Sequence, residues 1–344
     1  MSKDNFQEIK DIGFTSLIKK LSSYHGSERD EVIKGIGDDT AVYKNKQGTV
    51  SCATSEIFLE GIHFDVTYTP LHHLGYKLVT SAVSDIYAMN AEPVQLLVNI
   101  AIPNKYSVQM IEQLYKGIDS AAKDYNVQVS GGDTTASHQM LSVSVTALGA
   151  AKEKVLVFRN TAKDGDIICV TGDLGSALAG LRILMREKKH WQEHETESFQ
   201  PDIVDYEYVV KRQLLPVARK DLTDAIQQSG IKPSAMIDLT QGLMADLKSV
   251  AESSGLGTEL YSPAIPITLD TRKVADEMKE DVDKYAFYGG EDYEMLFTME
   301  EAMIEKFRET FDDFAVIGKM TNQYKALKIN TGEGETIKID LNES

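Results

Sequence analysis

The sequence predicts a mixed fold, α/β or α+β, in which helices cover one face of a β-sheet. Three observations support this prediction. The chain has 344 residues, which suggests two domains or one large one. Hydrophobic residues make up 42% and charged residues 26%, an ordinary balance for a globular protein. Up to about residue 150 the patterns follow the order helix, strand, helix, strand, helix, strand, strand, which is typical of helices layered on a sheet.

Hydrophobic periodicity places the elements of the first half of the chain. Leu141, Val143 and Val145 alternate with polar residues, which predicts a half-buried strand. Ser107 has the side chain of a helix N-cap. The predicted elements are a helix over 6–22, a strand over 50–58, a helix over 74–91, a strand over 94–102, a helix after Ser107, and strands over 127–130 and 140–148.

A second unit begins near Val155, so we predict domains at 1–152 and 153–344. The charged segment 186–206 contains few aliphatic residues and is predicted to be an exposed insertion. The remaining predicted elements are a strand over 167–170, a helix from 176 to 185, helices over 206–212 and 219–229, a strand over 237–239, a helix over 240–254, a strand near 259–261, a helix near 271–279, and strands over 295–298, 314–318 and 327–329.

Composition and charge exclude several classes of function. The formal net charge is −17, from 36 basic and 53 acidic residues, which argues against a nucleic-acid partner because phosphate contacts need a basic surface. No apolar run is long enough to cross a membrane. The N-terminus lacks the apolar core of a signal peptide, so we expect a cytoplasmic protein. Cys52 and Cys169 are too few for a disulfide framework and are expected to be buried thiols.

Carboxylates at the ends of predicted strands and helices are the candidate functional residues. Mg²⁺ prefers one or two protein carboxylates together with phosphate oxygens and water, so separated aspartates suit a polyphosphate ligand. Glycine beside a carboxylate also lets backbone N–H groups approach a phosphate closely. The familiar P-loop and Gly-x-Gly-x-x-Gly motifs are absent. The acidic positions are Asp38, Asp39, Glu56, Asp85, Asp133 and Asp238.

Each position also has a simpler structural explanation. A Gly-Asp pair usually forms a turn. Asp85 stands out because it interrupts an apolar helical pattern, where a buried carboxylate needs a partner, although an internal ion pair would also explain it. His63, between Ile62 and Phe64, is most simply a hydrogen-bonded core or interface histidine.

Taken together, these clusters resemble the thiamine-monophosphate kinase family of the AIR-synthetase-like superfamily. The resemblance extends from Phe14 to Ile329 and includes Bacteroidetes-like features at Ala88–Ala91 and Arg212–Asp221. It implies an N-terminal domain that dimerises through its sheet and a C-terminal α/β domain that closes over the nucleotide. The matching segments are Gly35–Val42, Leu59–Asp65, Leu74–Lys77, Ser84–Ala91, Gly131–Thr135, Ser144–Gly149, Val170–Gly172 and Gly289–Glu294.

The resemblance implies a role for each matching residue. ATP contacts are implied for Gly132, Asp133, Arg159 and Thr240, and substrate contacts for His63 and Glu291. The metal-binding positions that it implies are Asp38, Thr54, Ser55, Glu56, Asp85, Asp133, Asp238 and Gln241. The implied reaction is in-line transfer of the γ-phosphoryl group of ATP to thiamine monophosphate with Mg²⁺, which asks mainly for positioning and charge neutralisation and not for a strong general base.

The sequence departs from the family pattern at three places. Glu56 and Gln241 stand where the family usually has aspartates, and the chain ends in Ile339–Ser344 without the family's aromatic tail. A longer carboxylate and a neutral amide change the ligands that a near-octahedral Mg²⁺ requires. Besides an active kinase, these departures leave open a catalytically weak nucleotide-binding paralogue and an ATP-dependent enzyme with another acceptor.

Overall fold

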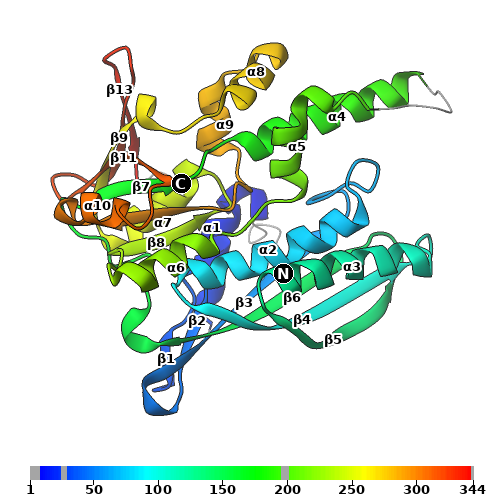
Figure 1. Ribbon diagram of the computed structural model, residues 1–344, viewed down its shortest axis with the longest axis horizontal. Coiled ribbons are helices and arrows are strands. Elements are labelled where there is room, and N and C mark those ends of the chain that lie inside the picture. The colour runs from blue at the N-terminus through cyan, green and yellow to red at the C-terminus, as the bar shows by residue number, and fades with distance from the viewer. Residues whose placement is uncertain (1–7, 25–28, 195–200, 342–344) are drawn as a thin grey trace, which may run out of the picture.

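The protein contains two β-sheets, each with helices packed against it (Figure 1). The computed structural model describes residues 8–24, 29–194 and 201–341. The helices are α1 (Ile9–Ser22), α2 (Leu71–Ala88), α3 (Val108–Asp124), α4 (Ser176–His194), α5 (Glu207–Leu214), α6 (Lys220–Ser229), α7 (Leu243–Ser254), α8 (Leu269–Met278), α9 (Val282–Tyr288) and α10 (Glu301–Arg308).

The first sheet has the strand order β1-β2-β3-β6-β4-β5. All neighbouring strands are antiparallel except β4 and β5, which are parallel. Parallel neighbours need a crossover, and α3 supplies it between these two strands. The strands are β1 (Val32–Lys34), β2 (Ala41–Lys44), β3 (Thr49–Leu59), β4 (Glu92–Pro103), β5 (Gln128–Ser137) and β6 (Ser142–Lys152).

Helices α2 and α3 lie side by side on one face of this sheet (Figure 1). Most of α2 is buried, and its buried surface includes polar side chains such as Lys77 and Ser84 as well as apolar ones. α3 is amphipathic and buries only Leu114, Gly117, Ile118, Ala121 and Ala122. The other face of the sheet carries apolar side chains that are exposed or half-buried, among them Ile57 and Leu97. The first sheet is therefore covered on one face only.

The second sheet has the order β13-β12-β9-β11-β7-β10-β8 and is covered on both faces. Along β10, Leu296 packs with residues of α7, whereas Phe297 packs with residues of α6 and α10. Successive side chains of a strand point to opposite faces, so this alternation places one helical layer on each side. The strands are β7 (Ile167–Thr171), β8 (Ala235–Leu239), β9 (Gly257–Tyr261), β10 (Glu294–Met299), β11 (Phe314–Thr321), β12 (Ala326–Asn330) and β13 (Thr336–Asp340).

The structure confirms the predicted mixed fold and most of the predicted elements, with corrections at three places. Strand β5 continues through Gly131–Thr135, which the sequence pattern placed in a loop. Helix α4 extends to His194, so the charged segment starting at 186 is helical up to that residue, and 195–200 lie outside the described residues. Elements β1, β2, α9, α10 and β13 were not predicted.

Two further observations bear on the expected class of protein. Cys52 and Cys169 are both buried and free, as predicted. No helix among the described residues has the length and apolar character needed to cross a membrane. The first sheet ends at Lys152, where we propose the boundary between the two domains.

Candidate active site

A cavity of about 600 Å³ lies between the two domains. This volume falls within the usual range for small-molecule sites. Its wall combines carboxylates, hydroxyls, aromatic rings and aliphatic side chains from both domains. From the first domain come β3, the loop that follows it and α2, and from the second come α4, α5 and the loops around 240 and 291.

Three buried or partly buried aspartates converge beside this cavity. Asp39, Asp85 and Asp238 each offer a carboxylate oxygen, and these oxygens all lie within 4.8 Å of one another. They come from the loop before β2, from α2 and from β8, so three distant segments meet at one point. Oδ2 of Asp39 and Oδ2 of Asp238 are buried without a hydrogen-bond partner among the described residues. Converging hard oxygen donors with unused lone pairs fit a divalent cation such as Mg²⁺.

The alternation of β3 explains which side chains join this cluster. Thr54, Glu56 and Phe58 share one face of the strand because successive side chains point to opposite faces. That face looks toward α2, where the hydroxyl of Thr54 donates a 2.5 Å hydrogen bond to Oδ2 of Asp85. Glu56 lines the cavity together with Asp85. Two of the predicted metal positions on β3 therefore do lie beside the cluster.

Burial and mutual repulsion raise the pKa values of these acids. Desolvation is the main cause of the high pKa of Asp85, and the charges of Asp238 and Glu56 raise it further. Burial also raises the pKa of Asp39, although Arg159 opposes that effect. The pKa of Asp238 rises to about 6, mainly through burial, and that of Glu56 to about 7 through burial and the charge of Asp238. The cluster therefore lacks sufficient positive charge of its own.

A second buried acid shapes the loop that carries Thr240 and Gln241. Oδ2 of Asp246 accepts hydrogen bonds from the backbone N–H groups of Thr240, at 3.1 Å, and Gln241, at 3.0 Å. Asp246 lies in the first turn of α7, where a carboxylate also interacts favourably with the helix dipole. Thr240 and Gln241 are consequently held at the cavity wall.

Asp38, which the sequence analysis selected, does not join the cluster. Its carboxylate pairs with Nζ of Lys34 at 3.4 Å and with Nε of Arg159 at 3.5 Å, and it accepts from the backbone N–H of Arg159 at 3.3 Å. Nη2 of Arg159 contacts Oδ1 of Asp39 instead. Asp38 thus has two cationic partners and anchors its loop, while the neighbouring Asp39 is the one that reaches the other aspartates.

Three other predicted residues lie on the uncovered face of the first sheet. Ser55 alternates with Thr54, so its hydroxyl lies beside that of Thr146, at 3.0 Å, away from Asp85. Asp133 lies on the edge strand β5 and accepts from the N–H of Thr134. A Cβ at Gly132 would lie 1.7 Å from the carbonyl oxygen of Val98, so only glycine fits there. Within a single copy of the chain, Ser55, Gly132 and Asp133 therefore lie away from the aspartate cluster.

The other wall of the cavity carries both predicted substrate residues. Nδ1 of His63 accepts a hydrogen bond from the N–H of Leu59 at 3.1 Å, which fixes the ring at the cavity. Oε2 of Glu291 accepts a hydrogen bond from Nζ of Lys77 at 3.0 Å. Lys77 also donates to the carbonyl oxygen of Gln213 at 3.0 Å. Among the residues that line the cavity, Lys77 is the one lysine or arginine.

The backbone around Glu291 is held in a demanding conformation. Glu291 and Tyr293 both have positive φ angles, 56° and 53°, which are uncommon for residues with side chains. Their N–H groups donate to the carbonyl oxygens of Thr240 and Leu239 at 3.0 Å, which fixes the segment against the neighbouring loop. A Cβ at Gly290 would lie 2.7 Å from the carbonyl oxygen of Thr240. The segment therefore presents Glu291 and Tyr293 to the cavity.

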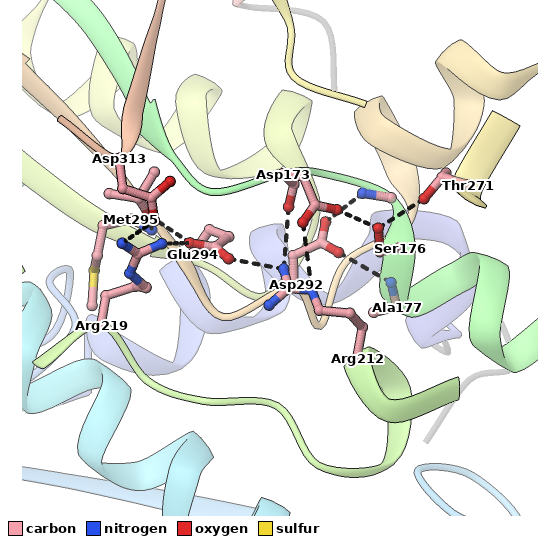
Figure 2. A network of polar contacts seen from close by, with 12 residues as sticks. Asp173, Ser176, Ala177, Arg212, Arg219, Thr271, Asp292, Glu294, Met295 and Asp313 are labelled. Atoms are coloured by element: carbon pink, nitrogen blue, oxygen red, sulfur yellow. Dashed lines mark hydrogen bonds and ion pairs between the residues drawn. The ribbon is translucent and has the colours of Figure 1, made fainter. Parts of the chain in front are cut away.

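The alternate residues of this segment enter a buried polar network (Figure 2). Glu294 bridges two guanidinium groups, Nη2 of Arg212 at 2.9 Å and Nη1 of Arg219 at 2.7 Å. Asp292 accepts from the N–H of Gly175 at 2.9 Å and from that of Ala177 at 3.3 Å, at the start of α4. These contacts hold the segment on the side away from the cavity. Through Arg212 they also connect it to α5, whose next residue, Gln213, lines the cavity.

Comparison with known proteins places this architecture in a family. The family AIR synthase related protein, N-terminal domain, matches residues 37–151, and the corresponding C-terminal domain matches 163–329. Thiamine-monophosphate kinase of Bacillus subtilis is 33% identical over 265 residues, which cover 77% of each chain. The enzyme of Aquifex aeolicus is 31% identical over 294 residues, covering 85% of this chain and 86% of that one. The chain belongs to the thiamine-monophosphate kinase family.

Solved structures support the same membership. A structure described as AaThiL complexed with AMPPCP and TMP superposes with a TM-score of 0.81 at 27% identity, and covers 97% of this chain and 99% of that one. Family membership and the geometry together direct attention to three residues that the sequence analysis did not assign. Asp39 appeared there only as the second aspartate of the Gly37–Asp39 motif. Lys77 appeared only within the matching segment Leu74–Lys77, and Asp246 was not considered. For Lys77 a signal existed, because it is a lone charge eight positions before Asp85 on a buried helix.

Proposed function

We propose that this chain transfers the γ-phosphoryl group of ATP to thiamine monophosphate and forms thiamine diphosphate. Family membership supports the reaction, because relatives at about one-third identity are named thiamine-monophosphate kinase. A similar solved structure also contains AMPPCP and TMP. The observation that carries the proposal is the cavity itself. It places an aspartate cluster on one wall and the Lys77–Glu291 pair with His63 on the other.

The metal-binding residues that we propose are Asp39, Asp85 and Asp238, with Thr54, Glu56 and Gln241 beside them. Magnesium would neutralise charge on the transferring phosphoryl group when it is bound there. The unpartnered oxygens of Asp39 and Asp238 and the raised pKa of Asp85 are what this requirement predicts for the free protein. Arg159 holds Asp39 in place and adds a positive charge beside the cluster.

The acceptor in this reaction is already an anionic phosphate oxygen. A new bond forms between that oxygen and the γ-phosphorus, and the bridging oxygen leaves with ADP, so no proton has to be removed by a strong base. Two polyanions must nevertheless approach each other. Lys77 lines the cavity with a buried ammonium group, and we propose that it contacts the acceptor phosphate.

The acceptor also carries aromatic rings, and the cavity has an apolar wall that suits them. Phe58, Phe64 and Tyr68 from the first domain face Leu181 and Met185 of α4. We propose that this wall holds the rings of the acceptor.

The residues on the uncovered sheet face enter the proposal through a second copy of the chain. Ile57 is exposed there, with 55% of its surface accessible, and Leu97 of β4 is half-buried on the same face, in register with Thr146. Apolar side chains on an uncovered sheet favour association. We propose a homodimer through this face, in which Ser55, Gly132 and Asp133 complete the ATP site, in a cytoplasmic enzyme.

The test is a chromatographic assay of the purified chain with ATP, Mg²⁺ and thiamine monophosphate. We expect thiamine diphosphate and ADP in equal amounts. Thiamine, which lacks the acceptor phosphate, serves as the matched control and should give no diphosphate. Hydrolysis of ATP without thiamine diphosphate would contradict the proposal.

Two positions favour a second candidate, a nucleotide-binding paralogue with weak catalysis. Glu56 and Gln241 both lie at the cavity, beside the cluster where the family pattern has aspartates. If ATP binds but no product forms with thiamine monophosphate, the double variant Glu56→Asp and Gln241→Asp distinguishes the remaining cases. Recovered activity would identify a weakened kinase, and continued inactivity would favour another acceptor.

A further inference from the structure

A second hollow lies at the junction of the two domains and shares no lining residue with the acidic cavity. Its volume is about 920 Å³. The first domain contributes the start of β3 and the end of β6, and the remaining wall comes from the connecting segment and the residues before β8. We call it the junction groove. Its charged residues are Lys152, Glu153, Lys154, Lys163 and Lys232.

The charge of the junction groove runs against that of the whole chain. The protein has 53 acidic and 36 basic residues, yet four lysines and one glutamate line this groove. Within the described residues, none of the four lysines forms an ion pair with a carboxylate. Like charges that outnumber the acids around them repel one another, so an anion that binds between them relieves that repulsion.

The floor of the groove is apolar. Leu156 is buried, and Ile33 and Phe158 are half-buried against the same core. A ligand that matches both parts carries negative charge at one end and a flat or aliphatic group at the other.

The groove is also built from fixed parts. The ammonium of Lys232 donates to the carbonyl oxygen of Leu156 at 3.0 Å and lies 3.5 Å from that of Lys154. The hydroxyl of Thr161 lies 2.8 Å from the carbonyl oxygen of Phe158 and 2.5 Å from that of Ser234, and these two oxygens share its one proton. These bonds tie the connecting segment to the second domain, so the groove is formed before any ligand arrives.

We propose that the junction groove binds a small phosphorylated molecule that also carries an aromatic ring. The lysines would hold the phosphate, and the floor at Leu156 and Phe158 would hold the ring. Such a ligand would contact both domains, and it would contact the residue that directly precedes Arg159. Arg159 in turn forms an ion pair with Asp39 of the aspartate cluster, so the groove is linked to that cluster through one peptide bond and one ion pair.

Calorimetry with the full chain tests this proposal, with EDTA present so that metal-dependent nucleotide binding is suppressed. The probes are AMP, which has phosphate and ring, inorganic pyrophosphate, which has charge alone, and adenosine, which has a ring alone. We expect AMP to bind most tightly and adenosine not to bind. Substituting the exposed Lys154→Gln and Lys163→Gln together should weaken AMP binding roughly tenfold or more, because two charges near the phosphate are lost.

The matched control removes two exposed lysines elsewhere, Lys116→Gln and Lys325→Gln, and should leave the affinity for AMP unchanged. Both variants change only exposed side chains, and circular dichroism checks that they fold. Equal losses in the two variants would mean a diffuse charge effect and would overturn the proposal. So would tighter binding of pyrophosphate than of AMP, or no AMP binding by the unmodified chain.

Discussion

Two groups of buried carboxylates in this protein differ in how far arginines neutralise their charge. In the network around Glu294, two arginines neutralise the acid at 2.7 and 2.9 Å (Figure 2). In the cluster of Asp39, Asp85 and Asp238, the three acids repel one another, and Arg159 contacts only Asp39. A buried charge is tolerated when it is paired and is costly when it is not. The charge of Glu294 is therefore neutralised within the chain, whereas the aspartate cluster has a deficit of positive charge that a bound cation would fill.

This difference distinguishes a buried charge that stabilises the fold from buried charges that suit a ligand. Glu294 has its counter-charge within the chain, so its energy does not depend on a ligand. The aspartate cluster has a high energy in the free protein, and that energy is released when a cation binds. Substitutions that remove one negative charge should consequently have opposite effects on stability in the two places.

The largest effect is expected for Asp85→Asn in the cluster. Loss of the central carboxylate should lower the rate of thiamine diphosphate formation about a thousandfold or more, because the charge that holds the metal is lost. In EDTA the same change should raise the free energy of unfolding, on the order of 1 kcal/mol, because repulsion with Asp238 and Glu56 is relieved. Enzyme assays and urea unfolding measure the two quantities. A variant less stable than the parent in EDTA would contradict this account of the cluster.

Glu294→Gln in the network should act in the opposite direction. Removing this carboxylate leaves Arg212 and Arg219 buried without their shared partner, which should lower the free energy of unfolding by about 3 kcal/mol. The matched control is Glu305→Gln, at an exposed pair with Arg308 at 3.8 Å, which should stay within about 0.5 kcal/mol of the parent. Urea unfolding of both variants checks the difference, and equal stability of the two would remove the contrast between the groups.

The third prediction concerns the cation on the opposite wall of the cavity. Lys77→Met should lower kcat for thiamine diphosphate formation roughly a hundredfold while leaving the affinity for Mg-ATP unchanged, because the lost ammonium faces the acceptor phosphate. Lys188→Met, which removes the partner of Asp65 at the cavity rim, is the control and should change kcat only a few-fold. A parallel loss of ATP affinity in the Lys77 variant would assign Lys77 to a purely structural role.

The sequence predicted the fold class and most elements because periodicity reports which side of a helix or strand is buried. It also gave Asp85, because a carboxylate in an apolar helix is a local signal. The choice between Asp38 and Asp39 has no such signal, since adjacent residues share every local property. Only the positions of Lys34 and Arg159, distant in sequence from each other, decide which aspartate has two cationic partners and which one reaches the cluster.

Strand alternation set the other limit on prediction. Thr54 and Ser55 were assigned together, yet adjacent residues in a strand must face opposite ways. Once β3 is recognised as continuous through both, a single chain can bring only one of them to Asp85. The proposed roles of Ser55 and Asp133 therefore rest on the homodimer that we propose, which no local pattern predicts.

The smallest change in stability and in metal affinity is expected when a negative charge is added beside the aspartate cluster. Gln241→Asp places a carboxylate beside Asp246, whose pKa burial already raises to about 7. Gln241 is exposed, so water screens the new charge, and the stability in EDTA should fall by only about 0.5 kcal/mol. The same charge should tighten Mg²⁺ binding roughly threefold, because an added acid at the cavity favours a cation. Calorimetric titration with Mg²⁺ measures this, with Gln323→Asp on an exposed turn as control. If Mg²⁺ binds no more tightly than to the parent, the cluster already supplies all the charge that its cation needs, and Gln241 is then a neutral replacement and not a defect.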